Sequence, residues 1–121
     1  MKAEAGRQGL LGEEQALAYF LKKGYRLLER RFRASGGEVD LILEQGACLV
    51  FVEVKRRPRG QKGEGLQAVT PQKQRRIVQA AGQYLLQTGG FSRPLRFDVV
   101  EVTAQGLYHV ENAFSGQWPG G

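Results

Sequence analysis

The chain has 121 residues, a length that accommodates one domain with a modest core. Its single cysteine and single histidine exclude an internal disulfide, a zinc finger and a two-histidine metalloprotease. Apolar residues make up 41% and charged residues 25%, which is typical of a folded globular domain and not of a disordered chain. We therefore expect one domain over residues 1–121, with a core from about residue 7 to 114 and a loose tail at 115–121.

The beginning of the chain gives no sign of export or of membrane insertion. Residues 1–7 contain no apolar signal core, and no stretch of about eighteen apolar residues is present to span a bilayer. The expectation is a cytoplasmic protein without a membrane partner.

The first predicted element is a helix over residues 9–23. Four apolar side chains recur at helical spacing on one stripe, and Gly24 follows as a stop signal. They are Leu10, Leu17, Phe20 and Leu21. Glu14 lies four residues after Leu10 and three before Leu17, so its carboxylate is expected on the same buried stripe. A slightly rotated helix would instead leave this carboxylate in water.

The rest of the chain predicts a mixed β-sheet and a second helix. A turn at Gln45-Gly46 joins two strands, and a loop rich in glycine is expected at residues 56–69. Thr70 and Pro71 are typical of a helix start, and this helix extends to about Gln87. The order α-β-β-β-α-β-β indicates an α/β fold in which helices flank the sheet. The predicted strands cover residues 25–33, 38–44, 48–55, 95–103 and 107–112.

Positive charge is concentrated in two blocks of the sequence. The net charge is +6, but residues 22–33 hold six bases and one acid, and residues 55–76 hold eight bases and one acid. The rest of the chain is acidic, so these blocks favour an anionic partner such as the backbone of a nucleic acid. The alternative is a solvated basic surface without a partner.

Two carboxylates, Asp40 and Glu53, fall on the two arms of the predicted hairpin. Side chains alternate along a strand, so Glu53 and Lys55 share one face. With a two-residue turn at Gln45-Gly46, Asp40 pairs with Phe51 and becomes a diagonal neighbour of Glu53, with Cα atoms about 7–8 Å apart. A three-residue turn without a bulge would place the two carboxylates on opposite faces.

Such a pair of carboxylates suits metal-dependent hydrolysis of a phosphodiester. Mg²⁺ prefers oxygen ligands and keeps several waters, so Asp40, Glu53 and the carbonyl of Val54 would suffice to bind it. Lys55 would orient or deprotonate the attacking water, and Glu14 would act as a further ligand or support one. The structural alternative is that Glu53 and Lys55 belong to an ion pair on an exposed face and that Asp40 faces solvent.

The same residues resemble a known nuclease superfamily. Val39-Asp40, twelve further residues and then Glu53-Val54-Lys55 resemble the PD-(D/E)xK pattern, with Val39 where proline is usual. Further segments are similar to the YraN family of small nuclease-like bacterial proteins, and the resemblance covers residues 7 to about 114. These segments are GEEQA at 12–16, GEVDLI at 37–42, FVEVK at 51–55 and RFDVV at 96–100. The layout is also similar to that of archaeal Holliday junction resolvases.

The resemblance implies a restriction-endonuclease-like core and a nucleic-acid-binding endonuclease that uses Mg²⁺ or Mn²⁺. It carries catalytic roles onto Asp40, Glu53, Lys55 and Glu14. Metal ligation falls on Asp40, Glu53, Glu14 and the Val54 carbonyl. The expected substrate is branched or otherwise structured DNA, with DNA favoured over RNA, and a symmetric junction would favour a homodimer. Two other functions stay open: a catalytically silent DNA- or RNA-binding protein with the nuclease fold, and a small basic RNA-associated protein.

Basic residues in both blocks are the expected contacts to the nucleic acid. They are Arg31, Arg33, Arg56, Arg57, Arg59, Lys62, Lys73, Arg75 and Arg76. Outside this set, Asp98 is expected to form a salt bridge with Arg96 or another base, and His109 is expected at the surface of its strand.

Overall fold

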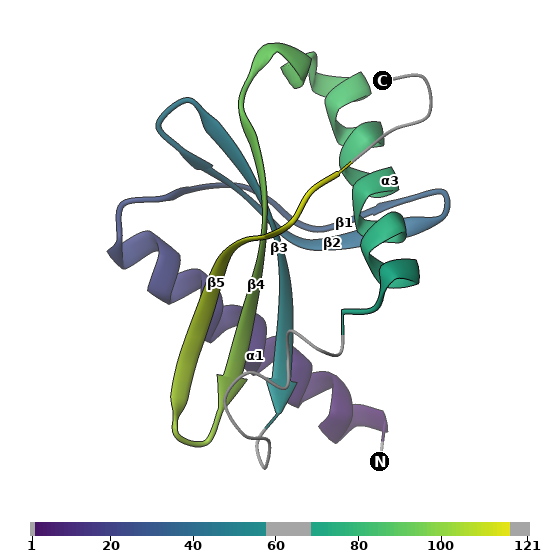
Figure 1. Ribbon diagram of the computed structural model, residues 1–121. Coiled ribbons are helices and arrows are strands. Elements are labelled where there is room, and N and C mark those ends of the chain that lie inside the picture. The colour runs from purple at the N-terminus through teal and green to yellow at the C-terminus, as the bar shows by residue number, and fades with distance from the viewer. Residues whose placement is uncertain (1, 58–68, 117–121) are drawn as a thin grey trace.

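The computed structural model describes residues 2–57 and 69–116, with side chains from residue 12 onward (Figure 1). Its element order confirms the predicted α-β-β-β-α-β-β arrangement and adds one short 3₁₀ turn. The elements are α1 (Lys2–Lys22), β1 (Arg26–Ala34), β2 (Gly37–Gln45), β3 (Cys48–Arg57), α3 (Pro71–Thr88), η1 (Gly90–Ser92), β4 (Leu95–Thr103) and β5 (Gly106–Phe114).

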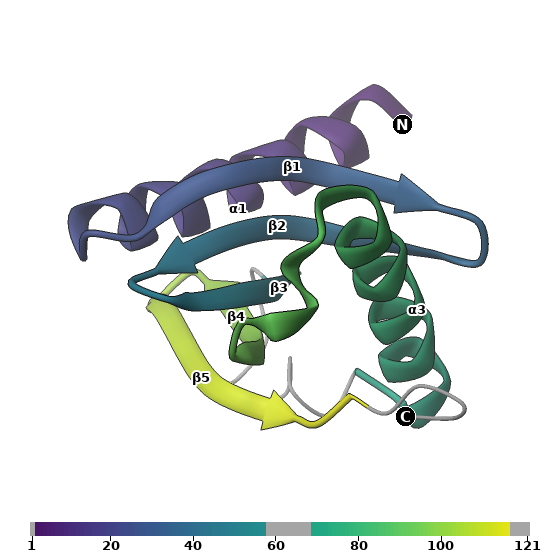
Figure 2. The same cartoon turned by 90° about the horizontal axis from the view of Figure 1, so that it is seen from above.

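The five strands form one mixed sheet in the order β1-β2-β3-β4-β5. β3 and β4 pair in parallel, and the other neighbours pair antiparallel. A parallel pair needs a crossover connection, and α3 lies in that connection. The view from above in Figure 2 shows α1 and α3 against different parts of the sheet, so the two helices cover opposite faces.

Two apolar clusters form the core, one on each face of the sheet. Phe51 of β3 packs in the cluster that contains Ile77 and Leu85 of α3. Val50 and Val52 pack in the other cluster, which contains Phe20 of α1. Side chains on β3 therefore alternate as predicted, and Glu53 shares the α3 side with Phe51.

Local signals set the ends of α3 as predicted. The side chain of Thr70 accepts a hydrogen bond from the backbone N–H of Lys73 at 3.2 Å, and Pro71 is the first helical residue. Gly89 ends the helix with a φ of 77°, and its N–H donates to the carbonyl of Leu85. The helix therefore starts at a fixed position beside the sheet, with Lys73 in its first turn.

Several element boundaries differ from the prediction, most of all at the start of α1. α1 begins at Lys2 and not at residue 9, and β3 extends to Arg57, so the first residues of the predicted loop are strand. The rest of that loop, at residues 58–68, and the tail from residue 117 lie outside the described residues. Within the described part, neither α1 nor any other helix is long and apolar enough to cross a membrane.

The predicted position of the β2–β3 turn was wrong by one residue. Gln45 pairs with Cys48, so the turn consists of Gly46 and Ala47, and Gly46 has a φ of 57° that suits a glycine. The turn still has two residues, so every side chain keeps its predicted face. Asp40 no longer pairs with Phe51, which faces Ile42 instead.

Candidate metal and nucleic-acid site

The sheet divides where Asp40 and Glu53 lie. The β2–β3 ladder ends at the pair Leu41 and Val52, whereas β3 stays paired with β4 as far as Arg57. In Figure 1, β1 and β2 turn toward α3, while β3 and β4 continue beside α1. Continuing the register by one residue would place Asp40 directly opposite Glu53, and no longer diagonally as the sequence predicted.

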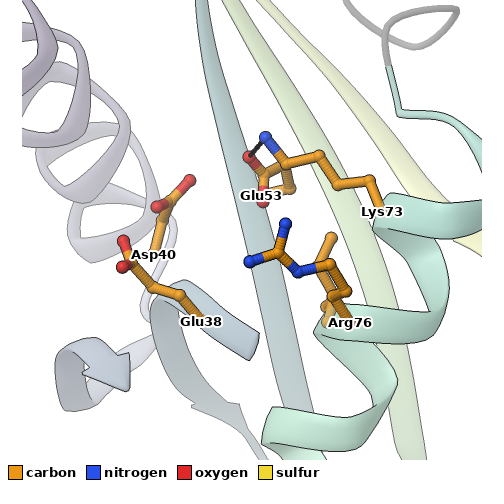
Figure 3. A pocket seen from close by; sticks show the side chains of 6 residues that line it. Glu38, Asp40, Glu53, Lys73 and Arg76 are labelled. Carbon is orange, nitrogen blue, oxygen red and sulfur yellow. Dashed lines mark ion pairs between the residues drawn. The ribbon is translucent and has the colours of Figure 1, made fainter. Parts of the chain in front are cut away.

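A pocket of about 230 Å³ lies between the separated strands and α3. Figure 3 shows Glu38 and Asp40 entering from β2, Glu53 from β3, and Lys73 and Arg76 from α3. Charged groups of both signs therefore meet around one opening. The residues that line it are Glu38, Asp40, Glu53, Lys73, Arg76 and Ile77.

Asp40 is held by the backbone of the neighbouring strand. Its Oδ2 accepts a hydrogen bond from the backbone N–H of Val54 at 2.7 Å. Burial and the nearby carboxylate of Glu53 raise the pKa of Asp40 to about 7, although the hydrogen bond from Val54 acts in the opposite direction. Burial and the charge of Glu53 therefore disfavour the ionised form of Asp40, and a cation beside it would stabilise that form.

Glu53 is almost fully buried and has two lysine partners. Its residue is 5% exposed, and its Oε1 lies 3.2 Å from Nζ of Lys73 and 3.6 Å from Nζ of Lys55. Burial lowers the pKa of Lys55, and the neighbouring Lys73 ammonium lowers it further, against the attraction of Glu53. Lys55 is therefore easier to deprotonate than an ordinary lysine.

The carbonyl of Val54 lies on the same edge of β3 as the Val54 N–H, because both groups of a strand residue point to one side. That N–H bonds to Asp40, so the carbonyl also faces the gap that β2 leaves. The structure thus brings three of the predicted ligand groups to one place: the carboxylates of Asp40 and Glu53 and this carbonyl.

The predicted position of Glu14 on the buried stripe of α1 was wrong. Glu14 is exposed, whereas Glu13 is 8% exposed and its Oε2 accepts a hydrogen bond from Nε of Arg31 at 2.7 Å. The charge of Glu13 also contributes to the raised pKa of Asp40. Glu13 therefore takes the place that was assigned to Glu14.

The spacing of residues in the sequence already indicated that Glu13 lies on the buried side of α1. Glu13, Ala16 and Phe20 follow each other at steps of three and four residues, and Ala16 and Phe20 are fully buried. The predicted stripe included Leu21, which is 49% exposed. The true stripe is rotated by about one residue, which moves Glu14 to the solvent.

The predicted nucleic-acid contacts fall into separate groups. Lys73 and Arg76 line the pocket, and Arg75 is exposed beside them on α3. On β1, Arg31 pairs with Glu13, and Arg33 pairs with Glu38 at 3.0 Å. Arg57 is partly buried at the end of β3, and Arg59 and Lys62 lie outside the described residues.

Arg56 lies on the other face of the sheet. It follows Val52 and Val54 on the α1 side, and its stem lies close to Gly12 of α1. Its Nε and Nη1 are buried and have no hydrogen-bond partner among the described residues. This side chain is directed away from the pocket.

The carboxylates do not form a complete metal cage. In the described ranges, 2–57 and 69–116, no group of three or more His, Cys, Asp or Glu residues is placed to hold a metal ion. A cation here would rely on two carboxylates and on ligands from outside the side chains, namely backbone carbonyls and water.

Comparison with known proteins matches residues 12–102 to the model of a family described as "Uncharacterised protein family UPF0102". A UPF0102 protein of Herminiimonas arsenicoxydans is 42% identical over 105 residues, which are 87% of this chain and 84% of the relative. One of Geobacter sulfurreducens is 43% identical over 111 residues, 88% and 87% of the two chains. A third, of Chlorobium phaeobacteroides, is 35% identical over 127 aligned residues, which cover 97% of this chain and 100% of the relative. The matched segment contains all six pocket residues.

Proposed function

This chain belongs to the UPF0102 (YraN) family, and we propose that it is a nucleic-acid-binding endonuclease that depends on Mg²⁺. The observation that carries the proposal is the meeting of Asp40 and Glu53 in one pocket, at the point where β2 leaves β3. Two acids beside two lysines provide ligands for a cation and positive charge for a phosphate, which are the requirements of phosphodiester hydrolysis.

The donor set fits Mg²⁺ or Mn²⁺. Mg²⁺ commonly binds through one or two carboxylates and keeps several waters, so it does not need a cage of protein ligands. Asp40, Glu53 and the Val54 carbonyl would hold it, and a cation there would stabilise the ionised form of Asp40, whose pKa is raised by burial and by the charge of Glu53. When bound, the metal would supply a Lewis acid for the phosphate and acidify a water.

Lys55 is the residue we assign to the attacking water. Its side chain is 22% exposed, so water reaches it, and its lowered pKa favours the neutral amine that accepts a proton. Glu13 replaces Glu14 in the supporting role: with its charge paired to Arg31, it would help to orient the site from α1.

The nucleic acid would approach along α3. Arg75 and Arg76 are exposed on this helix, and Arg76 also lines the pocket, so a phosphate backbone on this side would reach the two carboxylates. Arg31 and Arg33 would extend the contact along β1, each keeping an acidic partner. We leave Arg56 out of this interface because its Nε and Nη1 are buried and its stem packs against Gly12 of α1, on the opposite face. Structured DNA remains the proposed substrate.

The test is cleavage of linear, single-stranded, flap and four-way DNA substrates with Mg²⁺ or Mn²⁺. The wild type should cut at least one of them, and Asp40→Asn or Glu53→Gln should lower the rate by about a hundredfold or more, because each removes a ligand charge. Binding of uncut DNA in the presence of a chelator should change little in both variants.

The matched control is Glu44→Gln. Glu44 lies on β2 as Asp40 does, but its carboxylate pairs with Arg93 and Arg26 away from the pocket. Its cleavage rate should equal that of the wild type. DNA binding without any cleavage by the wild type, on every substrate and with both metals, would contradict the endonuclease and favour a catalytically silent binding protein.

A further inference from the structure

The two lysines that contact Glu53 are attached to different parts of the fold. Lys55 lies on β3 itself, two residues after Glu53, and its side chain is 22% exposed. Lys73 comes from the first turn of α3, and its side chain is 41% exposed. The more exposed lysine is nevertheless the closer one: its Nζ lies 3.2 Å from Oε1 of Glu53, against 3.6 Å for Lys55.

Both ammonium groups lie on the same carboxylate oxygen. The pocket is lined by three carboxylates and two cationic side chains, and Lys55 adds a third positive charge beside Glu53, so positive and negative groups are equal in number. The carboxylates are those of Glu38, Asp40 and Glu53, and the cationic lining groups are Lys73 and Arg76. A divalent cation on Asp40 and Glu53 would add two positive charges at the same oxygens. Like charges that share one oxygen repel strongly in a partly buried site, so one ammonium has to leave.

Lys73 is the group that is able to leave. Its backbone is fixed by the N-cap of α3, but a flexible four-carbon stem separates that backbone from the ammonium. The exposed part of the side chain opens toward solvent next to Arg75 and Arg76. Lys55 has less freedom because its side chain is more deeply buried between the strands and α3.

We infer that Lys73 is a tethered counter-ion of the metal site, which neutralises Glu53 until a divalent cation binds and displaces it. This inference rests on the proposed function, since it requires that Asp40 and Glu53 bind such a cation. Lys73 is thus a positioning residue: it holds the carboxylate of the buried Glu53 in place before the metal arrives.

The test is isothermal titration of Mn²⁺ into the full chain without nucleic acid. Lys73→Gln should bind Mn²⁺ about fivefold more tightly than the wild type, which is the affinity equivalent of one partly exposed ion pair. Lys73→Met, which keeps an apolar stem, should show the same gain, and Lys73→Arg should keep the affinity of the wild type.

Arg76→Gln is the control for charge alone. It removes one positive charge from the same pocket and helix, but the guanidinium of Arg76 donates to the carbonyl of Gly36 at 3.4 Å and not to Glu53. Its gain in Mn²⁺ affinity should be clearly smaller than that of Lys73→Gln. Thermal unfolding in a chelator gives a second measurement: Lys73→Gln should melt below the wild type, and Mn²⁺ should raise its melting temperature by more.

Equal Mn²⁺ affinity in the wild type and Lys73→Gln would overturn the inference and leave the proposed metal site intact. An equal gain in Arg76→Gln, or a gain in Lys73→Arg, would also overturn it, because the effect would then not depend on the contact with Glu53. If neither the wild type nor any variant binds Mn²⁺, both the inference and the metal-dependent function are wrong.

Discussion

At the scale of single residues, the carboxylate of Asp98 has four hydrogen-bond contacts. It is fully buried, and Arg96 donates two hydrogen bonds to it at 2.8 Å, which confirms the predicted salt bridge. His109 contacts it at 2.6 Å, and the N–H of Asn112 donates to it at 2.9 Å. His109 also contacts the hydroxyl of Tyr19, and its side chain is only 5% exposed, so its predicted surface position was wrong.

Asp98→Asn should lower the free energy of unfolding by about 3 kcal/mol at pH 7, because it leaves the largely buried charge of Arg96 without its carboxylate partner. Burial acts to raise the pKa of Asp98, but the bonds from His109, Arg96 and Asn112 outweigh it, so the pKa is lowered. A carboxyl with a lowered pKa stabilises the fold above its unfolded pKa of about 3.9 and loses this contribution as the pH falls below that value.

The difference in the free energy of unfolding between Asp98→Asn and the wild type should therefore shrink as the pH falls from 4 to 2. Urea unfolding at a series of pH values measures it. Glu111→Gln is the comparison, since Glu111 is 55% exposed and 4.0 Å from Nη1 of Arg96. It should change the stability by less than about 1 kcal/mol at any pH. If the free energy of unfolding of Asp98→Asn differed from that of the wild type by the same amount at every pH, the lowered pKa of Asp98 would be contradicted.

At the scale of elements, the contact between α3 and β2 determines the shape of the pocket. Gly37 of β2 lies directly against the helix backbone, and a Cβ at this position would collide with the carbonyl oxygen of Arg76. One residue earlier, the Gly36 carbonyl accepts a hydrogen bond from Nε of Arg76. The absence of a side chain at Gly37 therefore allows α3 to bring Lys73 and Arg76 to the carboxylates.

Gly37→Ala should destabilise the fold by about 1–3 kcal/mol, because helix and strand must move apart. Gly46→Ala is a suitable comparison: Gly46 lies in the turn that follows β2, and its φ of 57° disfavours alanine, but no described atom outside its chain neighbours lies within 4 Å of the added Cβ. Its cost should be only about 1 kcal/mol. Urea unfolding measures both, and equal losses would show that backbone strain, and not the helix contact, decides the effect.

At the scale of the whole molecule, the proposed binding of a nucleic acid depends more on where the basic side chains lie than on the net charge of +6. The arginines of α3 lie beside the pocket, whereas the end of α1 that carries Lys22 lies on the far side of the molecule, as Figures 1 and 2 both show. A backbone bound at the pocket would therefore contact the first group and not the second.

Replacing both Arg75 and Arg76 by Gln should weaken DNA binding and reduce its dependence on salt. Each phosphate contact that is lost should lower the slope of log K against log salt by about one unit. The control replaces Lys22 and Lys23 by Gln, which removes the same charge and should leave the slope close to that of the wild type. Fluorescence anisotropy of a labelled duplex from low to high salt measures both slopes.

Much of the fold could be predicted because its signals are local. Period-two alternation marked β2 and β3, and Thr70 with Pro71 marked the start of α3. The error at the hairpin turn did not affect the faces, because Gln45-Gly46 and Gly46-Ala47 are both two-residue turns. The placement of Asp40 and Glu53 on one face followed from this alternation together with the two-residue turn.

The sequence by itself thus determined the element order and the placement of two acids on one face of a hairpin, since each depends on neighbours a few residues away. Only the tertiary structure decided that Glu13 and not Glu14 faces the sheet, because one residue turns a helix by about 100° and packing selects the buried side. The contact of Lys73 with Glu53 was likewise decided by how α3 packs on the sheet. Contacts between segments distant in the chain follow from packing, for which no local pattern carries a signal.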